Sequence, residues 1–204
     1  MPEFRFRTLR AAGLVVLLVG CLGVAPRGAA AQDAAAFISN LGAQGMQVLG
    51  PSVPQQQRAA RFRQLLDQDF DLPEISRFVL GPHARSMSPA AQHEFQPLFR
   101  EYLVQAYTTR LGQYGGAPFQ VTGTRPYGGE TVVASQVQRG GGNPIQIEWH
   151  VINRGGRWLV TDVVVDGVSM KATQRSEFAS IIQRNGGQPD ALLAALRQQG
   201  AHSR

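Results

Sequence analysis

The sequence predicts an α+β fold, in which helices precede and follow a curved antiparallel sheet of about four strands. Up to Tyr114, apolar side chains recur at the three-to-four-residue spacing of amphipathic helices. After Gly115 and Gly116 the period changes to two, which is typical of strands with one buried face. Helical spacing returns towards the C-terminus, so that helices from both ends of the chain can cover the sheet.

Residues 1–31 are expected to be a signal peptide that directs export to the periplasm. Three arginines open the segment, an apolar stretch over residues 11–24 follows, and Ala29-Ala30-Ala31 offers a small-x-small cleavage site. The apolar stretch is shorter than the roughly 20 residues that a membrane-spanning helix needs. We therefore expect a signal that is removed, and not a membrane anchor.

Leu18-Val19-Gly20-Cys21 leaves a second processing route open, in which Cys21 would become a lipid-modified N-terminus. The chain stays apolar from Leu22 to Ala25, whereas a lipoprotein usually turns polar soon after its cysteine. This difference favours cleavage after Ala31. Either route takes the mature chain out of the cytoplasm.

Residues 32–204 are predicted to form a single domain, because no repeat or low-complexity linker divides them and their length is sufficient for a full core. Cys21 is the only cysteine, so the mature chain has no disulfide, cysteine nucleophile or thiolate metal site. Losing four arginines and Glu3 with the signal lowers the net charge from +6 to about +3. The remaining arginines are scattered, so nucleic-acid binding is not expected.

The segment 32–114 is predicted to be helical. Apolar residues follow helical spacing weakly around Phe37 and clearly over residues 59–70. Pro73 is expected to open a short helix that Gly81-Pro82 ends.

The longest predicted helix begins at Ser88-Pro89, where a hydroxyl can cap the helix and proline suits its first turn. It is expected to run to Tyr114, with a kink or a delayed start at Pro97. Two further helices are predicted over residues 172–199, separated by Asn185-Gly186.

Residues 117–166 are predicted to form the sheet, with strands around 119–121, 133–137, 145–151 and 158–164. Gly155-Gly156 is a two-residue hairpin turn that pairs Arg154 with Arg157. Counting back from this turn gives the expected register, which places Val151 opposite Val160, Trp149 opposite Asp162, and Ile147 opposite Val164.

The sequence does not predict an enzyme. It has no phosphate-binding glycine loop, nucleophile elbow or paired-histidine metal motif, so neither a metal nor a cofactor is expected. The best enzyme hypothesis pairs Asp162 with His150, as an acid and base in the pocket of a curved-sheet cone. The counted register puts His150 on the other face of the hairpin, where it cannot exchange a proton with Asp162. Asp162 is instead expected to hydrogen-bond buried backbone or the Trp149 indole.

Four stretches carry a family resemblance, namely FDLPEISRFVLG (70–81), FQPLFREYLVQAYTTRL (95–111), GRWLVTDVVVDGVSM (156–170) and QRSEFASIIQRNGG (174–187). The most specific element is DGVSM followed closely by QRSEF. In content and order these stretches resemble the MlaC family of periplasmic phospholipid-binding proteins, also called toluene-tolerance proteins.

The resemblance implies a curved sheet and helices that enclose an apolar cavity for a phospholipid ligand. It also implies shuttling between an outer-membrane lipoprotein complex and an inner-membrane ABC transporter with an MCE-domain subunit. A branch of the family linked to hopanoids shares these motifs, so a hopanoid or another lipid is an alternative ligand. Two alternatives of other classes are a cone-fold enzyme that uses Asp162 and a periplasmic adaptor that binds only protein.

The residues expected to line a lipid cavity are apolar side chains of the long helix, the sheet and the C-terminal elements. They are Phe95, Phe99, Tyr102, Leu103, Tyr107, Val133, Val137, Ile147, Trp149, Val168, Met170, Phe178 and Ile182. Each of them could instead be ordinary core. Arg77, Arg85 and Arg175 could contact the lipid phosphate, since arginine suits bidentate phosphate contacts, or they could form surface salt bridges.

Overall fold

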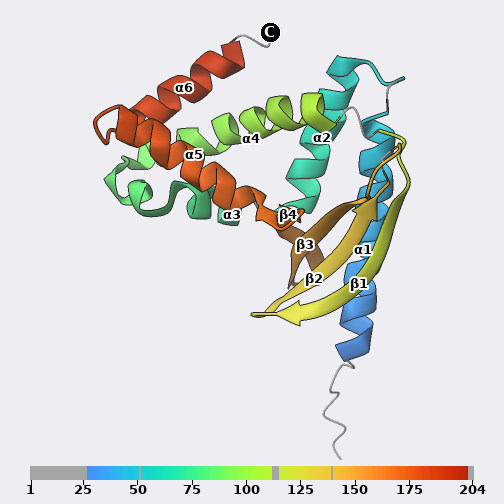
Figure 1. Ribbon diagram of the computed structural model, residues 1–204. Coiled ribbons are helices and arrows are strands. Elements are labelled where there is room, and N and C mark those ends of the chain that lie inside the picture. The colour runs from blue at the N-terminus through green and yellow to red at the C-terminus, as the bar shows by residue number, and fades with distance from the viewer. Residues whose placement is uncertain (1–26, 51, 112–114, 139, 202–204) are drawn as a thin grey trace, which may run out of the picture.

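The computed structural model describes residues 27–50, 52–111, 115–138 and 140–201, whose arrangement is shown in Figure 1. Most of the expected signal peptide, including Cys21, lies outside these residues, as does the predicted helix end at Tyr114. Within the described ranges, no helix combines the length and the apolar character that crossing a bilayer requires.

Helices form both ends of the described chain, as the sequence predicts. The N-terminal ones are α1 (Arg27–Val48), α2 (Gln55–Asp69), α3 (Leu72–Leu80), a 3₁₀ helix η1 (Gly81–Ser86) and α4 (Pro89–Leu111). The C-terminal ones are α5 (Met170–Arg184) and α6 (Asp190–Ala201).

Side-chain caps define where these helices start. The Asp71 carboxylate accepts a hydrogen bond from the Glu74 backbone N–H at 3.1 Å, and the Ser88 hydroxyl accepts one from Ala91 at 3.1 Å. Helix α4 begins at Pro89 and continues through Pro97. The alternative of a delayed start at Pro97 is therefore wrong, because the Ser88 cap already starts the helix upstream.

The sheet has five antiparallel strands in the order β1-β2-β3-β4-β5. They are β1 (Phe119–Tyr127), β2 (Glu130–Val137), β3 (Ile145–Arg154), β4 (Arg157–Val165) and β5 (Val168–Ser169). The α+β class is confirmed. The fifth strand was not predicted, because two residues are too few to show a period-two pattern.

The β3–β4 register follows the prediction near the turn and departs from it further away. Arg154 pairs with Arg157 and Val151 with Val160, as expected. A β-bulge then leaves Thr161 without a partner, so that the strand is shifted by one residue. The predicted partners of Trp149 and Ile147 are therefore wrong; Trp149 lies opposite Val163, Ile147 opposite Val165, and His150 opposite Asp162.

Two hydrophobic cores organise the fold. The first lies among α2 to α6 and contains Phe95, Phe99 and Phe178, each at most 1% exposed. The second lies between α1 and the sheet, and α1 runs beside β1 and β2 on the right of Figure 1. Phe62 and Phe70 pack against both cores, so the helical layer and the sheet meet there.

Asp71 connects the start of α3 to strands β3 and β4. Its backbone N–H donates to the Val160 carbonyl at 2.9 Å, and its carboxylate accepts a hydrogen bond from Arg154 Nε at 2.7 Å. The side chain of Asp71 is buried while also capping α3. The start of α3 and the β3–β4 hairpin are thus held together by Asp71.

We expect Glu101→Gln to weaken the contact between α2 and α4 in a pH-dependent way. Arg63 forms a bidentate pair with Glu101 at 2.8 and 2.7 Å, and these hydrogen bonds hold the pKa of the Glu101 carboxyl below its usual range. A lowered folded-state pKa contributes stability above the unfolded pKa, and this contribution is lost as the pH falls through the folded pKa. Both side chains are about one-third exposed, so the loss at pH 7 should stay below about 1 kcal/mol.

Urea unfolding of the unsubstituted protein and of Glu101→Gln, at pH 7 and near pH 2, measures the difference in their free energies of unfolding. This difference should be present at pH 7 and absent near pH 2. A difference that is the same at both pH values would contradict the assignment to the Arg63–Glu101 pair.

Candidate functional site

An apolar cavity of about 290 Å³ lies between the helices and the sheet. Helices α1 to α5 form one side of it, with α3 contributing Ile75, and strands β1 to β4 form the other. The apolar lining residues are Leu41, Met46, Leu49, Phe62, Leu65, Leu66, Phe70, Ile75, Phe99, Leu103, Tyr107, Phe119, Val137, Ile145, Ile147, Trp149, Val163, Val165 and Met170. Such a lining suits a ligand with little polar surface.

The volume can be converted into a number of ligand atoms. A dry protein cavity of about 150 Å³ holds one benzene, which corresponds to roughly 25 Å³ per carbon. On this scale the cavity of about 290 Å³ has room for roughly a dozen carbons, comparable with much of one acyl chain.

About half of the residues that the sequence predicts as lining lie in the wall of this cavity. They are Phe99, Leu103, Tyr107, Val137, Ile147, Trp149 and Met170. The Tyr107 hydroxyl lies 3.7 Å from the Met170 sulfur, which joins α4 to the start of α5 across the wall.

The other predicted residues lie elsewhere. Phe95 and Ile182 are buried in the helical core, and Val133 is buried under α1. Val168, on the short strand β5, is 54% exposed. Tyr102 and Phe178 line a different hollow. These positions share the apolar periodicity of the wall, but periodicity alone does not show which stretch of an apolar face borders a void.

Helix α1 supplies a wall that the sequence did not predict. Its lining includes Gly42 and Gly45, two residues of low helix propensity within α1. A Cβ on Gly42 would lie 2.3 Å from the Phe119 ring, so this glycine lets β1 approach the helix closely. A Cβ on Gly45 would meet no atom within 4 Å, which leaves the space beside it open. Two glycines on an apolar helix face were the available signal for this close packing.

Asp162 also lines the cavity, but its carboxylate is occupied by local hydrogen bonds. It accepts from the backbone of Val163 at 2.8 Å, from the Ser169 hydroxyl at 2.6 Å and from the backbone of Lys171 at 3.1 Å. The expected bonds to backbone are thus found. The expected bond to the indole is not, because Trp149 Nε1 donates to Ser135 Oγ at 2.8 Å.

The bulge makes His150 the strand neighbour of Asp162, although the counted register had separated them. Their side chains nevertheless have different partners. His150 Nδ1 lies 3.0 Å from Glu130, whose other oxygen accepts a hydrogen bond from Thr161 at 2.7 Å. Within the described part of the chain, no cluster of three or more His, Cys, Asp or Glu side chains could hold a metal ion.

Thr161 on β4, and Lys171 and Gln174 on α5, are the remaining polar residues of the wall. Gln174 is 4% exposed, and its Nε2 donates to Glu177 at 3.2 Å. Its Oε1 is buried without a hydrogen-bond partner among the described residues. Lys171 is partly exposed, and its ammonium lies 4.9 Å from the centre of the Phe78 ring.

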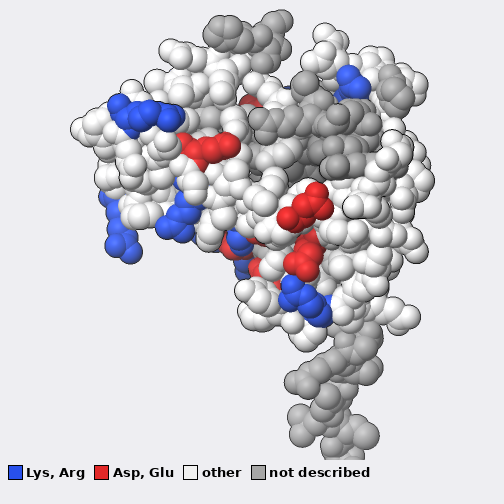
Figure 2. Space-filling model, viewed as in Figure 1, with Lys and Arg blue, Asp and Glu red and all other residues white. Residues whose placement is uncertain are grey.

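The three arginines that the sequence singled out have different surroundings. Arg77 and Arg85 are exposed and do not line the cavity. Arg175 is partly buried, with its guanidinium 5.2 Å from the centre of the Phe78 ring. Basic side chains gather along the lower left edge of the view, over α3 and η1 (Figure 2).

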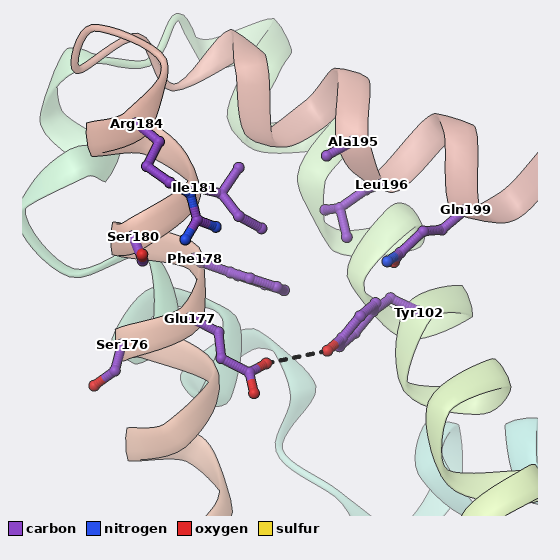
Figure 3. A pocket seen from close by; sticks show the side chains of 10 residues that line it. All are labelled: Tyr102, Ser176, Glu177, Phe178, Ser180, Ile181, Arg184, Ala195, Leu196 and Gln199. Atoms are coloured by element: carbon purple, nitrogen blue, oxygen red, sulfur yellow. Dashed lines mark hydrogen bonds between the residues drawn. The ribbon is translucent and has the colours of Figure 1, made fainter.

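A second hollow, of about 520 Å³, lies between α4, α5 and α6 (Figure 3). Its floor contains Phe178 and Leu196, and its rim carries Glu177, Arg184 and Gln199. Glu177 accepts a hydrogen bond from the Tyr102 hydroxyl at 3.3 Å across the groove. Although larger, this groove is open and has a polar rim, so the apolar cavity is the better site for a hydrocarbon chain.

Comparison with known proteins agrees with this architecture. Toluene tolerance protein ttg2D of Pseudomonas putida is 27% identical over 125 residues, covering 60% of this chain and 58% of that protein. The intermembrane phospholipid transport system binding protein MlaC of Haemophilus influenzae is 28% identical over 125 residues, covering 59% and 58%. The matched region thus spans less than two thirds of either relative.

A solved structure shares the fold. It is that of the phospholipid-binding protein from Ralstonia solanacearum in complex with a phospholipid, with a TM-score of 0.69, 21% identity, and coverage of 83% of this chain and 97% of that chain. The family model described as MlaC protein matches residues 47–198. Because this match covers most of the sequence, the chain belongs to the MlaC family.

Proposed function

We propose that this protein is a periplasmic lipid carrier, which takes the acyl chains of a phospholipid into the cavity between its helices and its sheet. The observation that carries the proposal is the apolar cavity itself, walled by α1, α4 and β1 to β4. The relatives named above support it, since one is called a phospholipid transport binding protein and a structure of the same fold holds a phospholipid.

The energetics of the cargo fit such a site. A phospholipid with two chains has about thirty methylenes, and exposing them to water costs on the order of 25 kcal/mol. A carrier must cover most of this surface and still release the lipid to a bilayer, which is an equally apolar solvent. A wall of aliphatic and aromatic side chains achieves this, because it adds few directional bonds that would hold the lipid back.

The cavity has room for roughly a dozen carbons, so it holds part of such a cargo in its present shape. Carrying two full chains requires it to widen. Helix α1 is the wall best suited to yield beside Gly45, because no atom lies within 4 Å of a Cβ placed there.

We further propose that the chain is exported by its N-terminal signal and shuttles lipid as the soluble component of an ABC transport system. Its partners would be an inner-membrane ABC transporter with an MCE-domain subunit and an outer-membrane lipoprotein complex. The family membership supports these partners. The enzyme alternative is not favoured, because the Asp162 carboxylate is committed to Val163, Ser169 and Lys171.

Native mass spectrometry of the protein purified from its own host tests the proposal. We expect a mass increment of one lipid, identified as phospholipid after extraction into organic solvent. If the extracted lipid is a hopanoid, the protein is a hopanoid carrier and not a phospholipid carrier. A ligand-free protein that also takes up no lipid from vesicles would contradict lipid carriage and favour the protein-binding adaptor.

A further inference from the structure

We propose that Lys171 and Arg175 form an anion-binding rim at the edge of the cavity, which binds the phosphate of the lipid head group. This inference rests on the proposed function and goes beyond it, because it assigns the cargo class. The favoured ligand is an anionic phospholipid, and not a neutral lipid of similar hydrocarbon size.

The first observation is where the two cations lie. Lys171 belongs to the cavity wall and is partly exposed, which places it where the apolar interior meets solvent. Its ammonium lies 4.9 Å and the Arg175 guanidinium 5.2 Å from the centre of the Phe78 ring, which places the two charges at most about 10 Å apart. Arg175 does not line the cavity itself, but it lies one turn after Lys171 on the same face of α5.

The second observation is that neither cation is neutralised. Neither Lys171 nor Arg175 has an acidic side chain within 4.0 Å among the described residues, whereas Arg63, Arg100 and Arg197 all do. Two like charges over one aromatic ring repel each other, and a bound anion relieves this repulsion. The arrangement suits a doubly esterified phosphate, which carries one negative charge.

The third observation is that Arg175 is held in place by its surroundings. Gly81 has a φ of +53°, and a Cβ there would lie 2.9 Å from Arg175 Nε, so the glycine makes room for the guanidinium. Phe78 supports it from α3. An arginine that is already ordered loses less side-chain entropy when it binds a phosphate.

Gln174 adds a polar acceptor beside these cations. It lies on the same helix, lines the cavity, and is 4% exposed. Because the Glu177 carboxylate accepts hydrogen bonds, the amide nitrogen of Gln174 must face it, and Oε1 is left as the unsatisfied acceptor. A hydroxyl on the head group, as in phosphatidylglycerol, would satisfy this atom.

Trp149 provides a direct readout, since it lines the cavity and lipids with brominated acyl chains quench tryptophan on contact. Phosphatidylglycerol, phosphatidylcholine and diacylglycerol with identical brominated chains should be titrated against the delipidated protein in a Trp158→Phe background. Phosphatidylglycerol should bind most tightly. Lys171→Gln and Arg175→Gln should each weaken phosphatidylglycerol binding roughly tenfold and should weaken diacylglycerol binding much less, so that the preference for phosphatidylglycerol falls.

Arg61→Gln is the matched control, because it removes the same charge from an exposed position on α2. Arg175→Lys should retain part of the preference for phosphatidylglycerol over diacylglycerol, because it keeps the positive charge. Thermal melting followed by circular dichroism shows whether each variant folds. If the variants bind phosphatidylglycerol as well as the unsubstituted protein does, the rim is refuted while lipid carriage stands. If no lipid quenches Trp149 in the unsubstituted protein, the proposed function fails, and the rim fails with it.

Discussion

Gly45→Phe should lower lipid uptake at least tenfold without lowering the stability of the empty protein. The new ring can start from the Cβ position without a clash, since no atom lies within 4 Å of it, and it extends into the cavity. Seven added carbons at roughly 25 Å³ each would occupy more than half of the cavity of about 290 Å³. Phenylalanine also has a better helix propensity than glycine, by roughly 0.5 kcal/mol.

Lipid uptake from vesicles and thermal unfolding of the delipidated protein should be measured on the same preparations. Gly200→Phe, on α6, is the matched control, because this helical glycine also faces open space and does not line the cavity. Unchanged uptake by a folded Gly45→Phe variant would show that the cargo does not enter beside α1. Combined loss of uptake and stability would show that the ring does not fit the void.

Asp162→Ala should destabilise the protein by about 2–4 kcal/mol, because the carboxylate joins β4 to the start of α5. The side chain is 6% exposed and accepts three hydrogen bonds. One of them comes from Lys171, whose backbone N–H in the first turn of α5 has no acceptor within the helix. Ser169 completes the cap by donating to Asp162 and accepting from Ala172 at 3.1 Å.

Urea unfolding measures this loss. The free energy of unfolding of Asp162→Asn should lie between those of Asp162→Ala and the unsubstituted protein. The amide keeps one oxygen acceptor but removes the negative charge from the N-terminus of α5. Asp190→Ala is the control, because Asp190 is an exposed carboxylate in the first turn of α6 and should cost less than about 1 kcal/mol. Equal stability of Asp162→Ala and the unsubstituted protein would refute the structural role and reopen the enzyme hypothesis.

The parts of the fold that depend on local chemistry could be predicted from the sequence. Ser88-Pro89 marks the start of α4, Gly81 marks the end of α3, and Gly155-Gly156 marks the β3–β4 turn. Each of these signals acts over a few residues, through a cap or a glycine with positive φ. The strand β5 gave no such signal, because it is defined by pairing with β4 and not by its own composition.

The bulge at Thr161 could not be predicted by counting residues from the turn. A single unpaired residue shifts every later pair, and its position depends on contacts with other strands. Here Thr161 donates to Glu130, on β2, which is distant in sequence.

Only part of the cavity wall could be predicted from the sequence, because the rest depends on how distant elements pack. Phe99, Leu103 and Tyr107 were identified because apolar side chains recur at helical spacing along α4. The contribution of α1 was missed, because Gly42 and Gly45 line the cavity without side chains that an apolar pattern could reveal. Phe95 has the same spacing but lies one turn earlier on α4, where it is buried in the helical core and stacks on Phe99 with the ring centres 5.4 Å apart.

The sheet contains two β-bulges, each with one residue that has no partner in the strand register. Thr161 interrupts the register of β4, and the register of β1 shifts in the same way between Val121 and Gly123. Such insertions bend and twist the strands that carry them, and these two flank β2 and β3 on either side. The bulged backbone therefore contributes to the space between the sheet and the helices. We expect deletion of Thr122 and Thr161 to flatten the sheet and to reduce the volume that is left for an acyl chain.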